Sequence, residues 1–396
     1  MKSKSQQVNP LLILILALGV FAIITTEVGI IGVLPLITEK FNITAAQAGW
    51  LVSIFALVVA VSGPFLTLLV SGINRKTILL TAVLLFAISN VVYAYTTRFD
   101  MMLIFRIIPA IFHPVFFSVA LVTGAKLVPP EKSSQAVAKV FTGITAGFSF
   151  GVPLTSYLAE RFSLEAAFWF GAVVSLIAFV GIWIWLPSMP VQERMSYGKQ
   201  ISILRKPALW LNIATVVFIF AAMFSVYSYF AEYLGQVTQM GGSWISVMLL
   251  AFGVIMIAGN LVFGQLLHRN IPRTVLLFPV LYMAAYLLVF YAGSYFIPMI
   301  ITVFVWGAIH SGGLIVSQTW LTTESQEAPE FGNSLFVSFS NLGITLGTSI
   351  GGWFIAQLGI HQVIWSGIIF GLLALVSIVV KKRFFNSRSR RSIKTV

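Results

Sequence analysis

The stretch LLILILALGVFAIITTEVGIIGVLPL, residues 11–36, is almost wholly apolar and carries one charged residue, Glu27. It is longer than the roughly 20 residues that a helix needs to cross a bilayer. A charge in hydrocarbon costs roughly 2.5–3.5 kcal/mol, so the Glu27 side chain should face a helix bundle or a wet cavity. Glu27 is also the acidic residue that lies deepest within an apolar stretch. We therefore predict a membrane helix here and a functional carboxylate within it.

The composition excludes a water-soluble globular protein, because 59% of the 396 residues are hydrophobic and only 9% are charged. Apolar stretches follow the first one to the C-terminus, so it is expected to remain as a helix rather than to be removed as a signal peptide. The chain has no cysteine, which rules out disulfides and thiolate metal sites. No nucleophile with an adjacent base, metal cluster or phosphate-binding loop is evident in the sequence. We expect no enzyme, no cofactor and no metal.

Hydropathy predicts twelve membrane spans. They lie near residues 11–36, 47–71, 77–96, 101–125, 136–160, 166–187, 208–232, 243–267, 274–293, 296–321, 332–356 and 362–380. With the N-terminus inside, 20 of the 24 Lys and Arg residues fall on one side, Lys40, Arg98 and Arg161 fall on the other, and Arg106 lies within a span. The positive-inside rule then predicts that both termini are cytoplasmic. The basic residues lie between and after the spans rather than on one soluble face, so no nucleic acid is expected as a partner.

The two halves of the chain repeat each other. GITAGFSFG begins at Gly143 and GITLGTSIG begins at Gly343, with six identities in nine positions at an offset of 200. His113 and His310 are 197 residues apart. Such a repeat is typical of a transporter whose substrate site lies between two six-helix halves. We predict an N-terminal half at residues 1–187, a cytoplasmic linker at 188–207, a C-terminal half at 208–380 and a basic cytoplasmic tail at 381–396.

Several motifs resemble those of the major facilitator superfamily. RIIPAIFHPVFFS, residues 106–118, is similar to the family's span-four motif, which opens with a buried arginine. GITAGFSFGVP, residues 143–153, is similar to the glycine-rich span-five motif associated with antiporters. LLVSGINRKTILL, residues 68–80, is similar to the family's loop signature, although Ser71 replaces its usual acidic residue.

Thr26-Glu27, His113 and Tyr227-Ser228-Tyr229 together make the chain resemble the drug:proton antiporter branch, which includes bacterial sugar-efflux, arabinose-efflux-like and purine-efflux proteins. The resemblance implies a multi-pass protein of the bacterial cytoplasmic membrane that exchanges a small-molecule substrate for protons. It also implies that the two halves alternate access to opposite sides of the lipid bilayer. We expect a monomer.

Glu27, Arg106 and His113 are the predicted proton-coupling residues. Arg106 and His113 are seven residues apart and share one helical face, and at about 1.5 Å per residue the depth of Glu27 falls between theirs. Burial favours a neutral carboxyl and a nearby guanidinium favours an ionised one, so a change in their separation would bind and release a proton. A structural glutamate is the alternative. Arg106 either positions Glu27 or a backbone carbonyl or touches substrate, and His113 either relays protons or remains a neutral hydrogen-bonding residue.

Other polar and glycine residues have weaker assignments. His310, Tyr227, Tyr229 and Gln318 are cavity candidates, with helix packing as the alternative. Gly143, Gly147, Gly151 and Pro153 form a smooth stripe followed by a bend, which is either a packing surface or a hinge that blocks leakage. Arg75, Lys76 and Arg273 are expected in cytoplasmic gating loops.

The few charges predicted for the cavity argue for neutral solutes, such as sugars, nucleobases or uncharged lipophilic drugs, and against a dedicated cation exporter. A proton-coupled exporter is the first hypothesis. A solute importer or facilitator of the same fold is the alternative, and a membrane sensor without transport activity is a more distant one.

Overall fold

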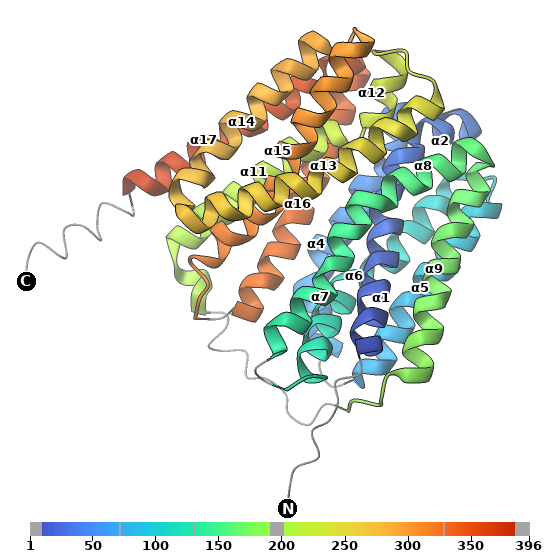
Figure 1. The fold of residues 1–396 in the computed structure, drawn as a ribbon, viewed down its shortest axis with the longest axis vertical. Helices are drawn as coiled ribbons and strands as arrows, with labels where there is room; N and C mark the ends of the chain where they lie inside the picture. Colours follow the sequence, from blue (N-terminus) through green and yellow to red (C-terminus); the bar gives the residue numbers. More distant parts are fainter. Residues whose placement is uncertain (1–9, 71–72, 130–131, 191–201, 328, 385–396) are drawn as a thin grey trace, which may run out of the picture.

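The structure is a computed structural model that describes residues 10–70, 73–129, 132–190, 202–327 and 329–384. The regular structure of these residues is helical throughout (Figure 1). In chain order the elements are α1 (Pro10–Gly29), η1 (Ile30–Val33), α2 (Leu34–Phe41), α3 (Ala45–Ala48), α4 (Trp50–Leu69), α5 (Arg75–Tyr95), α6 (Phe99–Lys126), α7 (Ser133–Ala146), η4 (Gly147–Gly151), α8 (Val152–Arg161), α9 (Leu164–Trp185), η5 (Ser202–Arg205), α11 (Pro207–Tyr227), α12 (Phe230–Gln236), α13 (Gly242–Arg269), α14 (Ile271–Ala292), α15 (Phe296–Thr322), α16 (Pro329–Leu358), η6 (Ile360–Gln362) and α17 (Val363–Phe384).

Ten helices among the described residues are long and apolar enough to cross a membrane. Several of them join neighbouring elements, as α1 does with η1 and α2, and α11 with α12. The predicted spans 136–160 and 332–356 are also helical, as α7–α8 and α16, but neither is among the ten. Much of the predicted linker 188–207 and most of the tail 381–396 lie outside the described residues. The prediction of a polytopic helical protein is confirmed.

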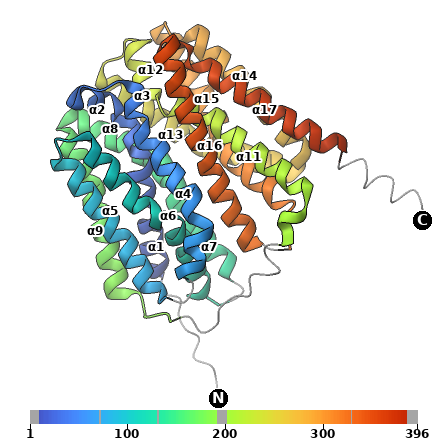
Figure 2. The ribbon, with the colours of Figure 1, turned by 180° about the vertical axis from the view of Figure 1, so that it is seen from behind.

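The helices form two packing groups. In the first, α1 packs on α7 and α9, α4 on α6, and α5 on α9; in the second, α11 packs on α16 and α17, and α13 on α15. The two groups lie side by side in both views (Figures 1 and 2). We call the end of the molecule that holds α2, α3 and α12 the distal end, and the opposite end, where α1 begins, the proximal end.

Two glycine stripes make equivalent contacts, one in each group, at an offset of 200 residues. The residues opposite them are Val20, Phe21 and Thr25 of α1 for Gly143, Gly147 and Gly151, and Phe220, Ala221 and Ser225 of α11 for Gly343, Gly347 and Gly351. Each of these glycines has a hydrogen atom where another residue would have a side chain, so the two helix backbones can approach closely. The stripe that contains Gly143 therefore holds α1 in place, which is the helix that carries Glu27.

Gly347→Ala is predicted to lower stability. A Cβ atom there would lie 2.8 Å from the Ala221 Cα and against the Ala221 carbonyl oxygen, and these backbone atoms cannot move aside cheaply. Overpacking of this kind costs typically 1–3 kcal/mol, which should lower the thermal unfolding midpoint of the purified protein by several degrees. Gly264→Ala is the matched control, because its nearest neighbour would be Ile315 Cδ1 at an ordinary 3.8 Å. Equal midpoints for the two variants would refute the packing role.

The span that contains Gly147 is not a regular α-helix. Residues Gly147–Gly151 form a π-helical turn that ends two residues before Pro153. Proline has no N–H, so Pro153 cannot donate to the Ser149 carbonyl as an ordinary helical residue would, and π-turns commonly accompany such breaks. The Ser149 carbonyl instead faces Gly253 of α13, in the second packing group. The bend predicted at Pro153 therefore marks a place where the groups meet.

The two groups meet mainly through α4 with α16 and α8 with α13. Ser156 of α8 and Ser246 of α13 bring their hydroxyl oxygens within 2.9 Å. Gly49, just before α4, faces the Tyr229 hydroxyl. α12 also packs against η1 and α2, which closes the distal end (Figure 1). Toward the proximal end the ribbons of the two groups stand apart in both views.

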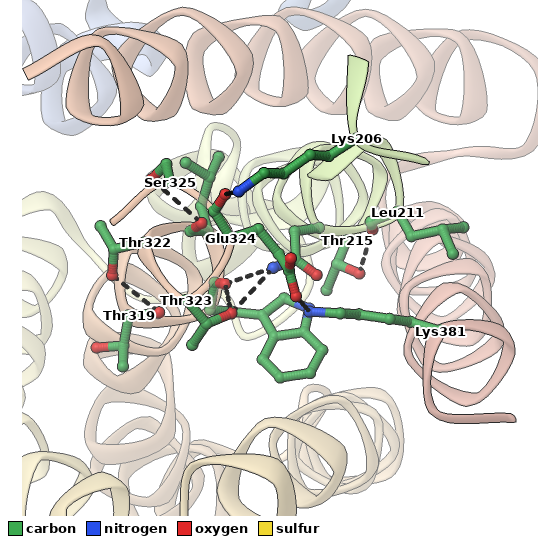
Figure 3. A network of polar contacts seen from close by, with 12 residues as sticks. Lys206, Leu211, Thr215, Thr319, Thr322, Thr323, Glu324, Ser325 and Lys381 are labelled. Carbon is green, nitrogen blue, oxygen red and sulfur yellow. Dashed lines mark hydrogen bonds and ion pairs between the residues drawn. The ribbon is translucent and has the colours of Figure 1, made fainter. Parts of the chain in front are cut away.

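A polar cluster joins the proximal ends of α11, α15 and α17 (Figure 3). Lys381 is only 3% exposed, and its Nζ lies 2.8 Å from Glu324 Oε1 and 3.9 Å from the centroid of the Trp320 ring. Asn212 of α11 donates to the Trp320 carbonyl. A buried lysine needs such partners, so the cluster holds these three helix ends together.

Candidate functional site

Glu27 lies near the end of α1, where its side chain is buried in the first packing group. The residue is 8% exposed, and its Oε2 atom lies 2.9 Å from His113 Nε2 of α6. The sequence left open whether the Glu27 carboxyl meets Arg106 or His113, and in the structure it contacts His113. The hydrogen bond can hold its proton on either partner, since an ionised carboxylate accepts from Nε2–H and a protonated carboxyl donates to a bare Nε2.

Aromatic side chains enclose the imidazole of His113. The Phe117 ring centroid lies 4.7 Å from it, and the Phe55 ring meets it edge-on at 5.6 Å. His113 Nδ1 is buried and has no hydrogen-bond partner among the described residues. A doubly protonated imidazolium would leave that second N–H unsatisfied, and an unsatisfied buried donor costs free energy. The surroundings therefore favour a neutral histidine that carries its proton on Nε2 and donates from it to the Glu27 carboxyl.

Arg106 is completely buried, with 0% of its surface exposed, and it binds backbone rather than a carboxylate. Its guanidinium donates to the carbonyls of Leu51 at 2.8 Å, Thr26 at 2.6 Å and Glu27 at 2.5 Å. Thr26 and Glu27 are among the last four residues of α1, whose carbonyls a helix end leaves in need of donors. A cation is also favourable at a helix C-terminus. Arg106 thus fixes the backbone from which the Glu27 side chain projects.

Asn90 of α5 supports the same turn of α1. Its Nδ2 donates to Thr26 Oγ1 at 2.8 Å and to the Phe86 carbonyl at 2.9 Å. Gly171 of α9 leaves room for this amide, because a Cβ atom there would lie 2.6 Å from Asn90 Oδ1. Asn90 was not predicted; a buried asparagine in an apolar span is the signal that could have found it.

A small cavity lies beside Glu27, between the two packing groups. The first group contributes residues of α1, α4 and α6, among them Glu27, Phe55 and Arg106. The second group contributes Phe224 of α11 and Ile344 of α16. With Arg106 and Glu27 both ionised the formal charge of the wall is balanced, and protonation of Glu27 leaves it with one positive charge. The cavity therefore combines apolar surface with one carboxyl group and one guanidinium.

The second group holds an uncharged counterpart of the Glu27 site. Tyr227 follows Glu27 by the repeat offset of 200, and its ring lies 4.6 Å from that of His310. His310 Nδ1 lies 2.7 Å from the hydroxyl of Tyr282, which also accepts from Trp306 Nε1 at 3.2 Å. The structure thus brings Tyr227 and His310, two of the predicted cavity candidates, together within a fully buried aromatic cluster.

The other two cavity candidates lie apart from this pair. The Tyr229 hydroxyl donates to the Thr348 carbonyl of α16 at 2.9 Å. Gln318 lies on α15, half-buried and two turns beyond His310. Gly49 of the first group also faces the Tyr229 hydroxyl, so Tyr229 lies at the contact between the groups. Among the described residues, no recorded contact joins Tyr229 or Gln318 to Glu27.

The predicted gating-loop residues contact neighbours in their own packing group. Lys76 Nζ donates to the Trp183 carbonyl at 2.7 Å, and the Arg75 backbone N–H donates to the Met189 carbonyl at 3.2 Å. The Arg273 backbone N–H donates to Asn270 Oδ1 at the start of α14. Ser71 lies outside the described residues. These bonds tie α5 to the end of α9 and cap α14.

Glu232 is a second buried acid, which the sequence prediction missed. It lies on α12 and is 7% exposed. The predicted span 208–232 ended at this residue, whereas the helical segment continues to Gln236. Tyr233 and Leu234, which follow Glu232, were a signal that the span runs further.

Comparison with known proteins gives the family. The Major Facilitator Superfamily profile matches residues 16–329 and 245–395. The Escherichia coli K12 "Inner membrane transport protein YdhP" is 30% identical over 372 residues, which cover 94% of this chain and 96% of that protein. The "Probable sugar efflux transporter" of Helicobacter pylori G27 is 26% identical, over 94% of this chain and 96% of that protein.

A solved structure shares the fold. A bacterial homologue of the human lysosomal transporter Spinster, in an inward-facing and occupied conformation, superposes with a TM-score of 0.80. It covers 98% of this chain and 99% of its own, at 16% identity. The family match and the transporters related to the chain over nearly its whole length confirm the predicted resemblance and exclude an enzyme. The chain is a multi-pass membrane transporter that belongs to the major facilitator superfamily.

Proposed function

We propose that the protein is a proton-coupled exporter of small neutral solutes. The observation that carries this proposal is the Glu27–His113 hydrogen bond at 2.9 Å, beside a cavity that Phe224 and Ile344 close from the other packing group. An intramembrane carboxyl with a single exchangeable proton is what proton coupling requires. Twelve spans in two six-helix halves, with both termini in the cytoplasm, complete the proposed architecture.

The proposed cycle alternates the exposure of Glu27 between the two sides of the membrane. The excess of Lys and Arg predicted for the cytoplasmic loops supports a cytoplasmic position for the proximal end and an outward-facing distal end. Contacts between α12 and η1 and between Ser156 and Ser246 support a state that is closed outward. A state that opens outward would admit a proton to the Glu27–His113 pair, and the state described here would release it inward in exchange for solute.

Arg106 supports a neutral rather than an anionic substrate. Its N–H groups already bind three backbone carbonyls, and the Phe55 ring lies 4.6 Å from its Cζ atom. Little of the guanidinium is left to bind a carboxylate or phosphate of a ligand. Phe55 and Phe224 offer apolar faces, and Glu27 offers one polar contact. Sugars, nucleobases and uncharged drugs share this combination, and one relative is named as a sugar efflux transporter.

The function is tested with purified protein in liposomes under an imposed pH gradient. A panel of sugars, nucleobases and neutral lipophilic drugs is added, and proton flux is followed with a trapped fluorescent dye. We expect one class of solute to drive proton movement opposite to its own. Solute that equilibrates without any proton flux would instead establish a facilitator, and co-directional flux would establish an importer.

A further inference from the structure

Glu232 has an incomplete set of partners for a buried carboxylate. Its Oε1 accepts a hydrogen bond from Gln236 Nε2, one turn later on α12. Its Oε2 is buried and has no hydrogen-bond partner among the described residues. Glu232 also takes no part in the ion pairs formed within the described part of the chain. Among the described residues, an ionised carboxylate in this position would have no cation beside it and only Gln236 as a side-chain hydrogen-bond donor.

The charged and titratable groups on the elements that pack against α12 are already paired or exposed. Lys40 of α2 forms its ion pair with Glu165 at 3.0 Å, and Glu39 beside it is exposed. His361 of η6 bonds to the Phe290 carbonyl at 2.9 Å. η1 carries no titratable residue, and those of α13 lie in its last turn at the far end. Tyr233 of α12 itself donates to the Val289 carbonyl.

The cost of burial depends on the charge of the carboxyl. An isolated ionised group transferred out of water costs far more free energy than its neutral form, and it takes up a proton instead. Glu232 is buried on α12, which packs against η1 and α2 of the first group and against α13 and η6 of the second. Separation of α12 from η1 and α2 would admit water to the carboxyl and let it ionise.

We propose that Glu232 is a second proton-binding site, which must be protonated before the distal end can close. It takes up its proton from the outer solution as α12 closes on η1 and returns it to the same side on reopening. It therefore adds no proton to the transport stoichiometry, and it makes outward closure sensitive to external acid. The inference rests on the proposed alternation between two states, and it does not require Glu27 to carry the coupled proton.

The absence of cysteine from the chain allows a direct test. Ser246→Cys places a single thiol in the contact between α8 and α13, where the serine is buried. Labelling from outside by a membrane-impermeant maleimide then reports opening of the distal end. The experiment is made in a Glu27→Gln background, so that titration of Glu27 contributes nothing. Because thiol reactivity itself rises with pH, the measured quantity is the ratio of labelling rates with and without Glu232.

As the pH rises from 5.5 to 8.5, we expect the protein with Glu232 to be labelled progressively faster than the Glu232→Gln protein. If ionisation of Glu232 destabilises closure by about 1.4 kcal/mol, the ratio of the two labelling rates reaches about tenfold at the highest pH. Glu232→Met, similar in length and uncharged, should behave like Glu232→Gln and guards against a folding defect in either variant. Glu39→Gln is the matched control, because it removes an exposed acid at the same end, and it should retain the pH dependence.

A ratio that stays constant with pH would overturn the role of Glu232. Absence of labelling at every pH, in every variant, would overturn both this inference and the proposed alternation. Failure of the proton coupling alone would appear in the liposome assay and would leave the labelling profile intact. The two proposals can therefore fail separately.

Discussion

Glu27→Gln is expected to abolish uphill export while leaving the protein folded. Glutamine keeps the size of the side chain and can still accept from His113 Nε2–H, but it cannot bind and release a proton. The cavity wall would then carry the charge of Arg106 permanently, as it does when Glu27 is protonated. The measurement is solute accumulation against its gradient in liposomes with an imposed pH difference, which should fall to the level of empty liposomes.

Glu39→Gln is the matched control for this variant. It is the same substitution at an exposed residue of α2, and we expect wild-type accumulation. Downhill movement of solute by the Glu27→Gln protein should persist, because the cavity keeps its shape. Undiminished uphill transport in that protein would show that Glu27 is a structural residue held by His113.

A disulfide between positions 156 and 246 is expected to stop transport completely and reversibly. The hydroxyl oxygens of Ser156 and Ser246 lie 2.9 Å apart, and an S–S bond of about 2.05 Å needs only a small adjustment of the two side chains. The bond would hold α8 against α13 and prevent the distal end from opening. Ser156→Cys/Ser246→Cys protein should therefore lose all solute exchange on oxidation and recover it with a reductant.

A second pair of cysteines within one packing group provides the control. Thr215 of α11 and Ser377 of α17 bring their hydroxyl oxygens within 2.7 Å. A bridge between Thr215→Cys and Ser377→Cys joins two helices of the second group, which move together in the proposed cycle. It should leave transport unchanged. Continued transport by the fully cross-linked 156/246 protein would exclude alternating access through this contact.

The sequence was informative where a single residue broke a uniform pattern. Glu27 stands out because its surroundings are apolar, and the structure finds it buried beside a cavity. The glycine stripes stand out because they recur at an offset of 200, and each packs on the equivalent helix. Long runs of apolar residues are compatible with few structures other than membrane helices, so the fold class could be predicted from the sequence.

The rotation of each helix about its axis and its register against its neighbours could not be predicted from the sequence. Arg106 and His113 share one face of α6, so either could reach a carboxylate on α1. The outcome depends on where α1 ends, because its terminal carbonyls take up the guanidinium and leave His113 for Glu27. Glu232 is buried on α12, which packs against η1 and α2, two elements that are distant from it in sequence. Hydropathy contains no information about such contacts.

The difference between Glu27 and its counterpart Tyr227 has an electrical consequence. In the proposed exchange only one of these two repeat positions holds a carboxylate, so a neutral solute exchanged for one proton moves one elementary charge across the membrane in each cycle. Membrane voltage then contributes roughly 2.3 kcal/mol per 100 mV, which corresponds to about a 40-fold concentration ratio of solute. A cell that keeps its pH gradient and loses its voltage would lose that share of its export.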